Sequence, residues 1–341
     1  MILNEKKINQ LFDLWLLTSL ILVFLIVIVG GLTRLTNSGL SITEWELFKG
    51  VLPPLNEGAW NLYFDLYKEI PQYRLLNFNM TLEEFKIIFY WEYFHRILGR
   101  LIGLFFLIPL IYFYFKKRIN KKYLSNCYLI MFLILLQGVV GWYMVSSGLV
   151  NNVSVSHYRL SLHLFIAFII ISMIFWMLLN FKNKTLLNFF NFKKESFFFY
   201  FLIFLIFTQI ILGAFVSGLD AGKIYQTWPL MGENYVPDDF IFDKIVSFID
   251  FNNHSLVQFY HRNFAYLITL YIFILFFYIV KNKKRVLYKP IFLLVFFLIL
   301  QVILGIFSLL SDLNILIASA HQISSVILTL TALNLYYSRI K

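Results

Sequence analysis

The 341-residue sequence is poor in cysteine and in charged residues. Its single cysteine, Cys127, excludes intrachain disulfides, thiolate zinc sites and iron–sulfur clusters, because each of these needs several thiolates. Charged residues make up only 14% of the chain, against about 25% in soluble domains. A water-soluble globular enzyme is therefore a poor description of this sequence.

Apolar and aromatic residues take the place of the missing charge. Hydrophobic residues make up 60% of the chain and aromatic residues 20%, including 40 phenylalanines and 21 tyrosines. A soluble fold would leave many of them in exposed apolar patches, whereas lipid can cover them. The net charge of +11 comes from short basic clusters between apolar runs, so these clusters indicate membrane topology, and no nucleic-acid binding is expected.

Eight apolar stretches are long enough to cross a bilayer as a helix, which takes about 20 residues. Their approximate ranges are 14–32, 90–115, 123–145, 160–181, 196–217, 256–280, 290–310 and 315–337. Backbone polar groups must be paired inside lipid, and helices pair them within one segment. The predicted fold class is therefore an all-α integral membrane protein with eight transmembrane helices.

Basic residues concentrate in alternate connections, such as KKRINKK at 116–122 and KNKKRVLYK from Lys281. The positive-inside rule places these connections and both termini in the cytoplasm. The long loops at 33–89 and 218–255 then face outward. No import leader or cleavage site precedes the first span, so the expected location is a bacterial plasma (inner) membrane.

The two halves of the chain resemble each other, with three matched motifs. The matched pairs are IVGGLTRLTNSGLSITEW at 28–45 with ILGAFVSGLDAGKIYQTW at 211–228, EYFHR at 92–96 with QFYHR at 258–262, and LLQGVVGWY at 135–143 with ILQVILGIF at 299–307. This repeat predicts two pseudo-symmetric four-helix bundles, at residues 1–182 and 183–341.

Four of the six histidines lie in the even-numbered spans, near their outer ends: His95, His163, His261 and His321. Ionisable side chains are expensive in a membrane and usually face a bundle interior, so four at repeated positions favour a common ligand. Heme fits this pattern, because two imidazoles can bind one iron while apolar side chains surround the porphyrin. The repeat pairs His95 with His163, and His261 with His321. Zinc or copper is the weaker alternative, because a third protein ligand is lacking.

Three arginines lie beside these histidines, at Arg96, Arg100 and Arg262. A guanidinium group binds a carboxylate through two parallel hydrogen bonds, so these residues are candidate contacts for heme propionates. The alternative is that the side chains extend to the outer membrane interface.

A carboxylate distinguishes the first half from the second. Glu92 lies one helical turn before His95, whereas the matching position in the second half is the neutral Gln258. A carboxylate beside a heme can accept a proton or stabilise positive charge on a substrate, so the first half is the predicted reactive site. The alternative is an interfacial Glu92 paired with Arg96 or water.

Together with RLSLHL around His163 and AHQ at 320–322, these motifs resemble the heme A synthase family of alphaproteobacteria and mitochondria over nearly the whole chain. The resemblance implies oxidation of the C8 methyl group of heme O to a formyl group, with water as oxygen source, for cytochrome oxidase biogenesis. It implies a resident heme b on His261 and His321, a substrate heme between His95 and His163, and Glu92 as the catalytic glutamate.

The resemblance also implies partners: heme O synthase (a farnesyltransferase), cytochrome oxidase assembly factors and an electron acceptor that the sequence does not identify. Self-association into a homo-oligomer is left open. Some bacterial members carry a cysteine pair in the first outer loop, but residues 33–89 contain none, so a mechanism that needs that disulfide is excluded.

Two other functions are compatible with parts of this pattern. A non-catalytic di-heme cytochrome b subunit would carry the same four histidines, and Glu92 is the residue that distinguishes it from an enzyme. A transporter with inverted repeats is disfavoured, because the halves run parallel and their polar residues cluster at one face.

Overall fold

The computed structural model describes residues 5–44, 49–150, 152–190, 194–239 and 248–341. Within these ranges the chain is helical, contains no strand, and has eight helices long and apolar enough to cross a membrane. They are α1 (Glu5–Leu35), α4 (Leu82–Lys116), α5 (Lys121–Ser146), α6 (His157–Lys182), α7 (Phe197–Gly218), α8 (His254–Lys281), α9 (Tyr288–Leu310) and α10 (Ile315–Ile340). The predicted fold class, with its eight spans, is confirmed.

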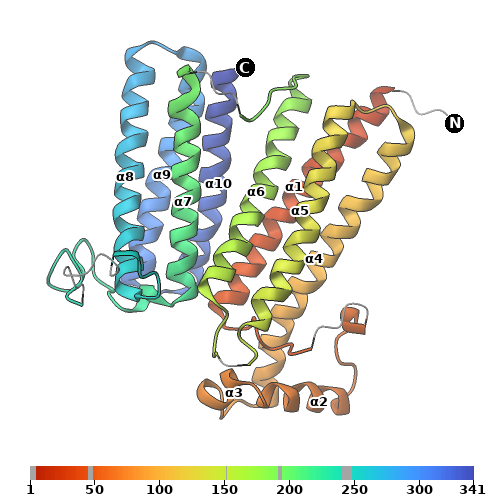
Figure 1. Cartoon of the computed structure of the whole chain (residues 1–341), viewed down its shortest axis with the longest axis vertical. Helices are drawn as coiled ribbons and strands as arrows, with labels where there is room; N and C mark the ends of the chain where they lie inside the picture. Colours follow the sequence, from red (N-terminus) through yellow and green to blue (C-terminus); the bar gives the residue numbers. More distant parts are fainter. Residues whose placement is uncertain (1–4, 45–48, 151, 191–193, 240–247) are drawn as a thin grey trace. The chain divides into compact units, whose positions relative to one another are not determined.

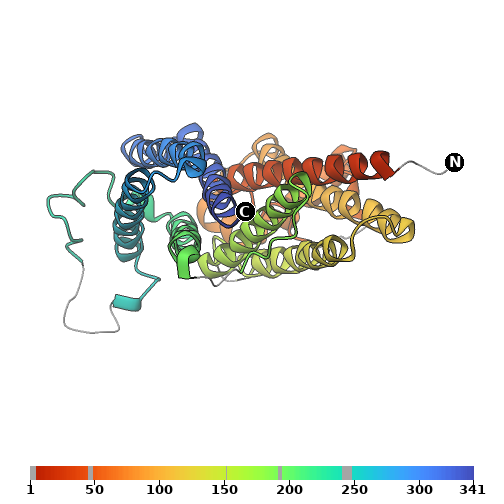
Figure 2. The ribbon, with the colours of Figure 1, turned by 90° about the horizontal axis from the view of Figure 1, so that it is seen from above.

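The chain divides into two compact units, Met1–Ile174 and Phe175–Lys341, with the boundary inside α6. The first unit holds α1, α4, α5 and most of α6 (Figure 1). The second holds α7 to α10, coloured from green to dark blue in Figure 2. The shorter elements of the described ranges are α2 (Glu57–Lys68), α3 (Pro71–Leu76) and the 3-10 turns η1 (Lys49–Val51), η2 (Lys194–Ser196), η3 (Ala221–Lys223) and η5 (Arg285–Leu287).

Aromatic side chains join α1 to α4 in the first unit. The ring of Trp15 on α1 lies 4.7 Å from that of Phe106 and 5.4 Å from that of Phe113, both on α4. Its indole nitrogen also donates a hydrogen bond to the carbonyl of Phe105 at 3.1 Å. Because the indole N–H has a partner, this bulky side chain can be buried inside the unit.

Helix α4 begins at Leu82 instead of at residue 90, where the apolar stretch begins. Its first turn is stabilised by a capping box, in which Thr81 and Glu84 satisfy each other's backbone N–H groups. At about 1.5 Å per residue the helix is roughly 52 Å long, well beyond the 30 Å or so of a hydrocarbon core. The early turns of α4 therefore extend past the lipid and are available for packing.

Helices α2 and α3, called here the α2–α3 segment, lie across this end of α4 (Figure 1). Phe85 of α4 is fully buried, and its ring lies 5.0 Å from Phe64 and 5.2 Å from Tyr67 of α2. Trp60 packs edge-on against Phe89 at 5.0 Å. This aromatic cluster explains why a segment that the sequence marks only as an outer loop forms helices.

Tyr67 ties the α2–α3 segment to the chain that leaves α1. Burial raises the pKa of Tyr67 to about 12, so its hydroxyl stays protonated at neutral pH. The hydroxyl donates to the side-chain oxygen of Gln72 at 3.0 Å and accepts from Asn77 at 2.7 Å. Gln72 in turn donates to the carbonyl of Asn37, just after α1, at 3.2 Å.

Replacing the central ring tests this packing. Phe85→Ala is expected to destabilise the α2–α3 segment by about 3–5 kcal/mol, because a fully buried aromatic side chain is lost. Limited proteolysis of the purified protein should then cut residues 55–80 faster. Phe94→Ala is the matched control, since Phe94 is 56% exposed on the same helix. Equal cleavage of the two variants would contradict the packing described.

Candidate functional site

The four histidines of the even-numbered spans lie on α4, α6, α8 and α10, and all are half-buried: His95, His163, His261 and His321. His95 and His163 belong to the first unit, and their ring centroids are 6.5 Å apart with the planes at 81°. His261 and His321 belong to the second unit, on α8 and α10. The first unit thus brings two imidazoles together from two helices, and the second carries one imidazole on each of two helices.

The spacing of the first pair suits a shared iron. Two metal–imidazole bonds of about 2 Å, with about 1 Å from each ring nitrogen to its centroid, place two centroids roughly 6 Å apart. The separation of 6.5 Å between His95 and His163 is close to this value. Nowhere in the described residues do three His, Cys, Asp or Glu side chains gather closely enough to hold a metal ion. The pair can therefore supply two axial ligands to heme, but not a three-residue zinc site.

Each of these histidines lies against a glycine of the preceding odd-numbered span. A methyl group added to that glycine would lie 3.4 Å from a ring atom at Gly30 (facing His95), 3.1 Å at Gly141 (His163), 3.0 Å at Gly213 (His261) and 2.9 Å at Gly305 (His321). Three of these distances are shorter than ordinary van der Waals contact, so the ring fills the space that a side chain would need. Glycine at these places lets the imidazole lie directly on the neighbouring helix backbone.

This close approach can be tested within α5. Gly141→Ala is expected to displace the His163 ring and weaken hemin binding at that site roughly 10-fold. Hemin titration of the purified protein, followed by absorbance, measures the effect. Gly138→Ala serves as the control, because a methyl group there meets no atom within 4 Å. If both variants bind hemin equally well, the glycine does not position the ring.

Glu92 is buried, with 3% of its surface exposed, and both carboxylate oxygens are engaged. Oε2 accepts hydrogen bonds from the hydroxyl of Ser41 at 2.8 Å and from the backbone N–H of Ile42 at 2.9 Å. Oε1 accepts from Nη2 of Arg96 at 2.7 Å and from its Nε at 3.1 Å. Four donors thus hold one carboxylate beside the helix turn that carries His95.

A turn after α1 delivers Ser41 and Ile42 to Glu92. Asn37 adopts a left-handed conformation with φ of 52°, which ends the helix, and the N–H of Ser38 donates back to the carbonyl of Thr33 at 2.9 Å. Asp220 adopts the same left-handed conformation, also with φ of 52°, after α7. The sequence repeat is therefore present as a repeated backbone turn.

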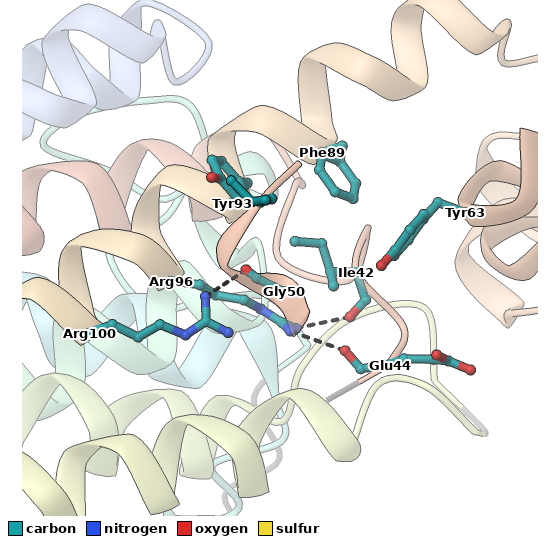
Figure 3. A pocket seen from close by; sticks show the side chains of 9 residues that line it. Ile42, Glu44, Gly50, Tyr63, Phe89, Tyr93, Arg96 and Arg100 are labelled. Carbon is teal, nitrogen blue, oxygen red and sulfur yellow. Dashed lines mark hydrogen bonds between the residues drawn. The ribbon is translucent and has the colours of Figure 1, made fainter. Parts of the chain in front are cut away.

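Arg96 and Arg100 bind the backbone of the loop that follows this turn (Figure 3). Arg96 donates to the carbonyl of Ile42 at 2.9 Å and to that of Glu44 at 3.3 Å. Arg100 donates to the carbonyl of Gly50 at 2.8 Å. These residues line a shallow pocket together with Tyr93 and other side chains. The two arginines therefore hold this loop against α4.

The second unit repeats this arrangement without the carboxylate. Gln258, at the position of Glu92, is also buried and donates to the carbonyl of Tyr225 at 2.9 Å. Arg262, at the position of Arg96, donates to the same carbonyl at 2.8 Å. Tyr225 matches Ile42 in the repeat, so both units bind the same loop carbonyl. At this position the two units thus differ in the charge of one buried side chain.

The sequence predictions missed the residues that surround the histidines. The facing glycines and the donors Ser41 and Ile42 were not singled out, although the aligned motifs LLQGVVGWY and ILQVILGIF place glycine at matching positions. His157, a fifth histidine, begins α6 and is buried, with 8% of its surface exposed. Repeated glycines within apolar spans were the available signal, but their contacts require the tertiary structure.

Comparison with known proteins gives the family. The family model described as cytochrome oxidase assembly protein matches residues 13–333. A protein of Pelagibacter ubique named heme A synthase is 47% identical over 330 residues, covering 96% of each chain. Proteins with the same name from Rickettsia bellii, 44% identical, and Flavobacterium johnsoniae, 39% identical, cover 96% and 93% of this chain, and 97% and 94% of their own lengths.

The matched range, residues 13–333, extends over both units. The chain belongs to the heme A synthase family of cytochrome oxidase assembly proteins.

Proposed function

We propose that this chain oxidises the C8 methyl group of heme O to a formyl group, giving heme A, and that Glu92 is the catalytic carboxylate. A first two-electron oxidation would add the oxygen of water to the methyl carbon, giving an alcohol and releasing two protons. A second would give an aldehyde hydrate, which loses water. The observation that carries the proposal is a buried carboxylate one turn from a paired histidine, in a chain whose relatives are named heme A synthase.

The surroundings of Glu92 suit this role. Its charge is balanced by Arg96 on one oxygen and solvated by Ser41 and Ile42 on the other, so the carboxylate is preorganised before substrate binds. In that state it can accept a proton from the attacking water or stabilise positive charge that develops on the substrate. Gln258 can do neither at the equivalent place, which favours the first unit as the reactive one.

The histidine pairs would divide the two roles of heme. His95 and His163 would flank heme O as substrate, supported by their centroid separation. His261 and His321 would hold a resident heme b, which supplies one-electron transfer toward an acceptor still to be identified. Propionates are expected near Arg96 and Arg100 in the first unit and near Arg262 in the second, because guanidinium groups match carboxylate geometry.

Glu92→Gln tests the catalytic proposal. The second unit already accommodates a glutamine with an arginine one turn later, so the variant should fold and retain its hemes. Conversion of heme O to heme A is expected to fall at least 100-fold, because the charge is lost. The measurement is chromatography of hemes extracted from cells that co-express heme O synthase.

Glu83→Gln is the control on the same helix, since the Glu83 side chain is 79% exposed. Normal heme A in the Glu92→Gln strain would refute the catalytic role and favour the di-heme cytochrome. Loss of heme A in both variants would likewise count against a specific role for Glu92.

We also propose that both termini are cytoplasmic and that the histidine pairs lie toward the outer face of a bacterial plasma membrane. The buried Cys127 gives little background for cysteine labelling. Leu55→Cys, 77% exposed before α2, should react with an impermeant maleimide in intact spheroplasts. Val286→Cys, 79% exposed between α8 and α9, should react only after lysis. The opposite labelling pattern would invert the proposed topology.

A further inference from the structure

Three of the four histidine-facing glycines are preceded by a glutamine. Gln137, Gln209 and Gln301 each lie four residues, or about one helical turn, before the glycine, on α5, α7 and α9. Glutamine and glycine therefore share one helix face. In α1 the same position holds Ile26, four residues before Gly30.

The glutamines contact the histidines themselves. Gln137 donates to the backbone carbonyl of His163 at 2.9 Å. Gln209 donates to the carbonyl of His261 at 2.9 Å, and the same amide nitrogen lies 3.1 Å from the Nδ1 atom of that ring. The bonds to the backbone carbonyls hold the helix turn on which each imidazole is mounted. When iron binds Nε2 of His261, Nδ1 carries a proton, and the Gln209 side-chain oxygen, which is buried without a partner, can accept it after the amide turns over.

Gln301 holds its histidine in a related way. Its backbone carbonyl accepts from Nδ1 of His321 at 3.1 Å, which leaves Nε2 to bind iron, and its side-chain nitrogen, 3.4 Å from Nε2, has to turn aside when iron binds there. Ser324 also donates to the oxygen of the Gln301 side chain, which restricts the amide. The second unit therefore has a glutamine on each of its two histidines.

Unpaired atoms at His163 point to a further hydrogen bond. The Nδ1 atom of His163 and the side-chain oxygen of Gln137 are both buried without a partner. A histidine that binds iron through Nε2 carries a proton on Nδ1, and this proton needs an acceptor. The oxygen of Gln137 can provide it, and such a bond fixes the tautomer and strengthens the imidazole as a ligand.

His95 has no comparable support. Ile26 offers neither a donor nor an acceptor, and within the described ranges no hydrogen bond reaches the His95 ring. Its ring faces the backbone at Gly30 and lies near the ring of His163. Of the four proposed iron ligands, His95 is therefore the one that its surroundings restrain least.

We propose that the glutamines make His163, His261 and His321 permanent axial ligands, and that His95 is the ligand that dissociates when heme enters and leaves the first unit. This inference rests on the proposed function, in which the first unit must release its product while the second retains its heme. The first unit, with Ile26 four positions before Gly30, would thus exchange its heme. The second unit, with a glutamine four positions before each of its facing glycines, would retain its heme.

Heme exchange measures this difference without turnover. The purified protein is loaded with hemin, and transfer of hemin to excess apomyoglobin is followed by absorbance. Two phases are expected, a fast one from the first unit and a slow one from the second. After reduction, carbon monoxide should bind rapidly to about half of the heme, because it requires an axial position that a weak ligand can vacate.

Two substitutions should move the phases in opposite directions. Ile26→Gln is expected to slow the fast phase 10- to 100-fold, and Gln209→Leu to accelerate the slow phase by a similar factor. Leu25→Gln, on an exposed neighbouring position, and Thr208→Leu, whose hydroxyl bonds only its own helix at Phe204, are the matched controls. If Ile26→Gln fails to fold, Gln209→Leu alone still decides.

Equal loss rates from the two units would overturn the inference, as would a Gln209→Leu protein that behaves like Thr208→Leu. The protein could show both phases with the expected shifts and still fail to convert heme O. That result would overturn the proposed function and leave the ligand assignment intact. Conversion of heme O with both phases insensitive to Ile26→Gln and Gln209→Leu would overturn the inference alone.

Discussion

The structure depends on the contact between a histidine ring and a glycine of the preceding odd-numbered span. An iron atom accepts two imidazoles only within a narrow range of distance and direction, so both rings must be placed by their helices. Glycine lacks the side chain that would otherwise displace the ring. At Gly305, for example, an added methyl group would lie only 2.9 Å from a ring atom of His321. It also lowers helix stability by about 1 kcal/mol relative to alanine, and lipid, which enforces backbone pairing, offsets this cost.

On this shared framework the two units differ in charge more than in geometry. In both, an arginine on the histidine helix donates to an equivalent loop carbonyl, at Ile42 or at Tyr225. In the first unit alone, the partner side chain is a carboxylate, buried with its arginine. A buried carboxylate is costly unless a cation and hydrogen-bond donors compensate its charge, so a reactive Glu92 requires Arg96 beside it, even where Arg96 has no direct part in the chemistry.

Much of the fold could be predicted from the sequence, because a helix that crosses lipid needs a long apolar stretch that is easy to recognise. Apolar length alone places eight spans, and the repeat pairs His95 with His163. The start of α4 was predicted too late, at residue 90, because its early turns are stabilised by packing against α2, and not by lipid. Hydropathy carries no information about such a contact.

The surroundings of the site were harder to predict. For Arg96 and Arg100 the sequence predicts propionate contacts or interfacial side chains, and it gives no sign of the bonds to loop carbonyls that the structure adds. Those carbonyls belong to a loop whose conformation depends on the left-handed turn at Asn37. The contact between Gln137 and His163 was equally invisible, because a glutamine in an apolar span has many potential partners until the helices are placed.

The central claim is that two imidazoles converge on each heme iron. Near-infrared magnetic circular dichroism of the protein loaded with ferric heme tests this most directly, because the charge-transfer band reports the axial ligands. The account predicts the low-spin band of bis-histidine ligation for heme in both units. A high-spin spectrum, or a band that indicates a ligand other than histidine, would contradict it.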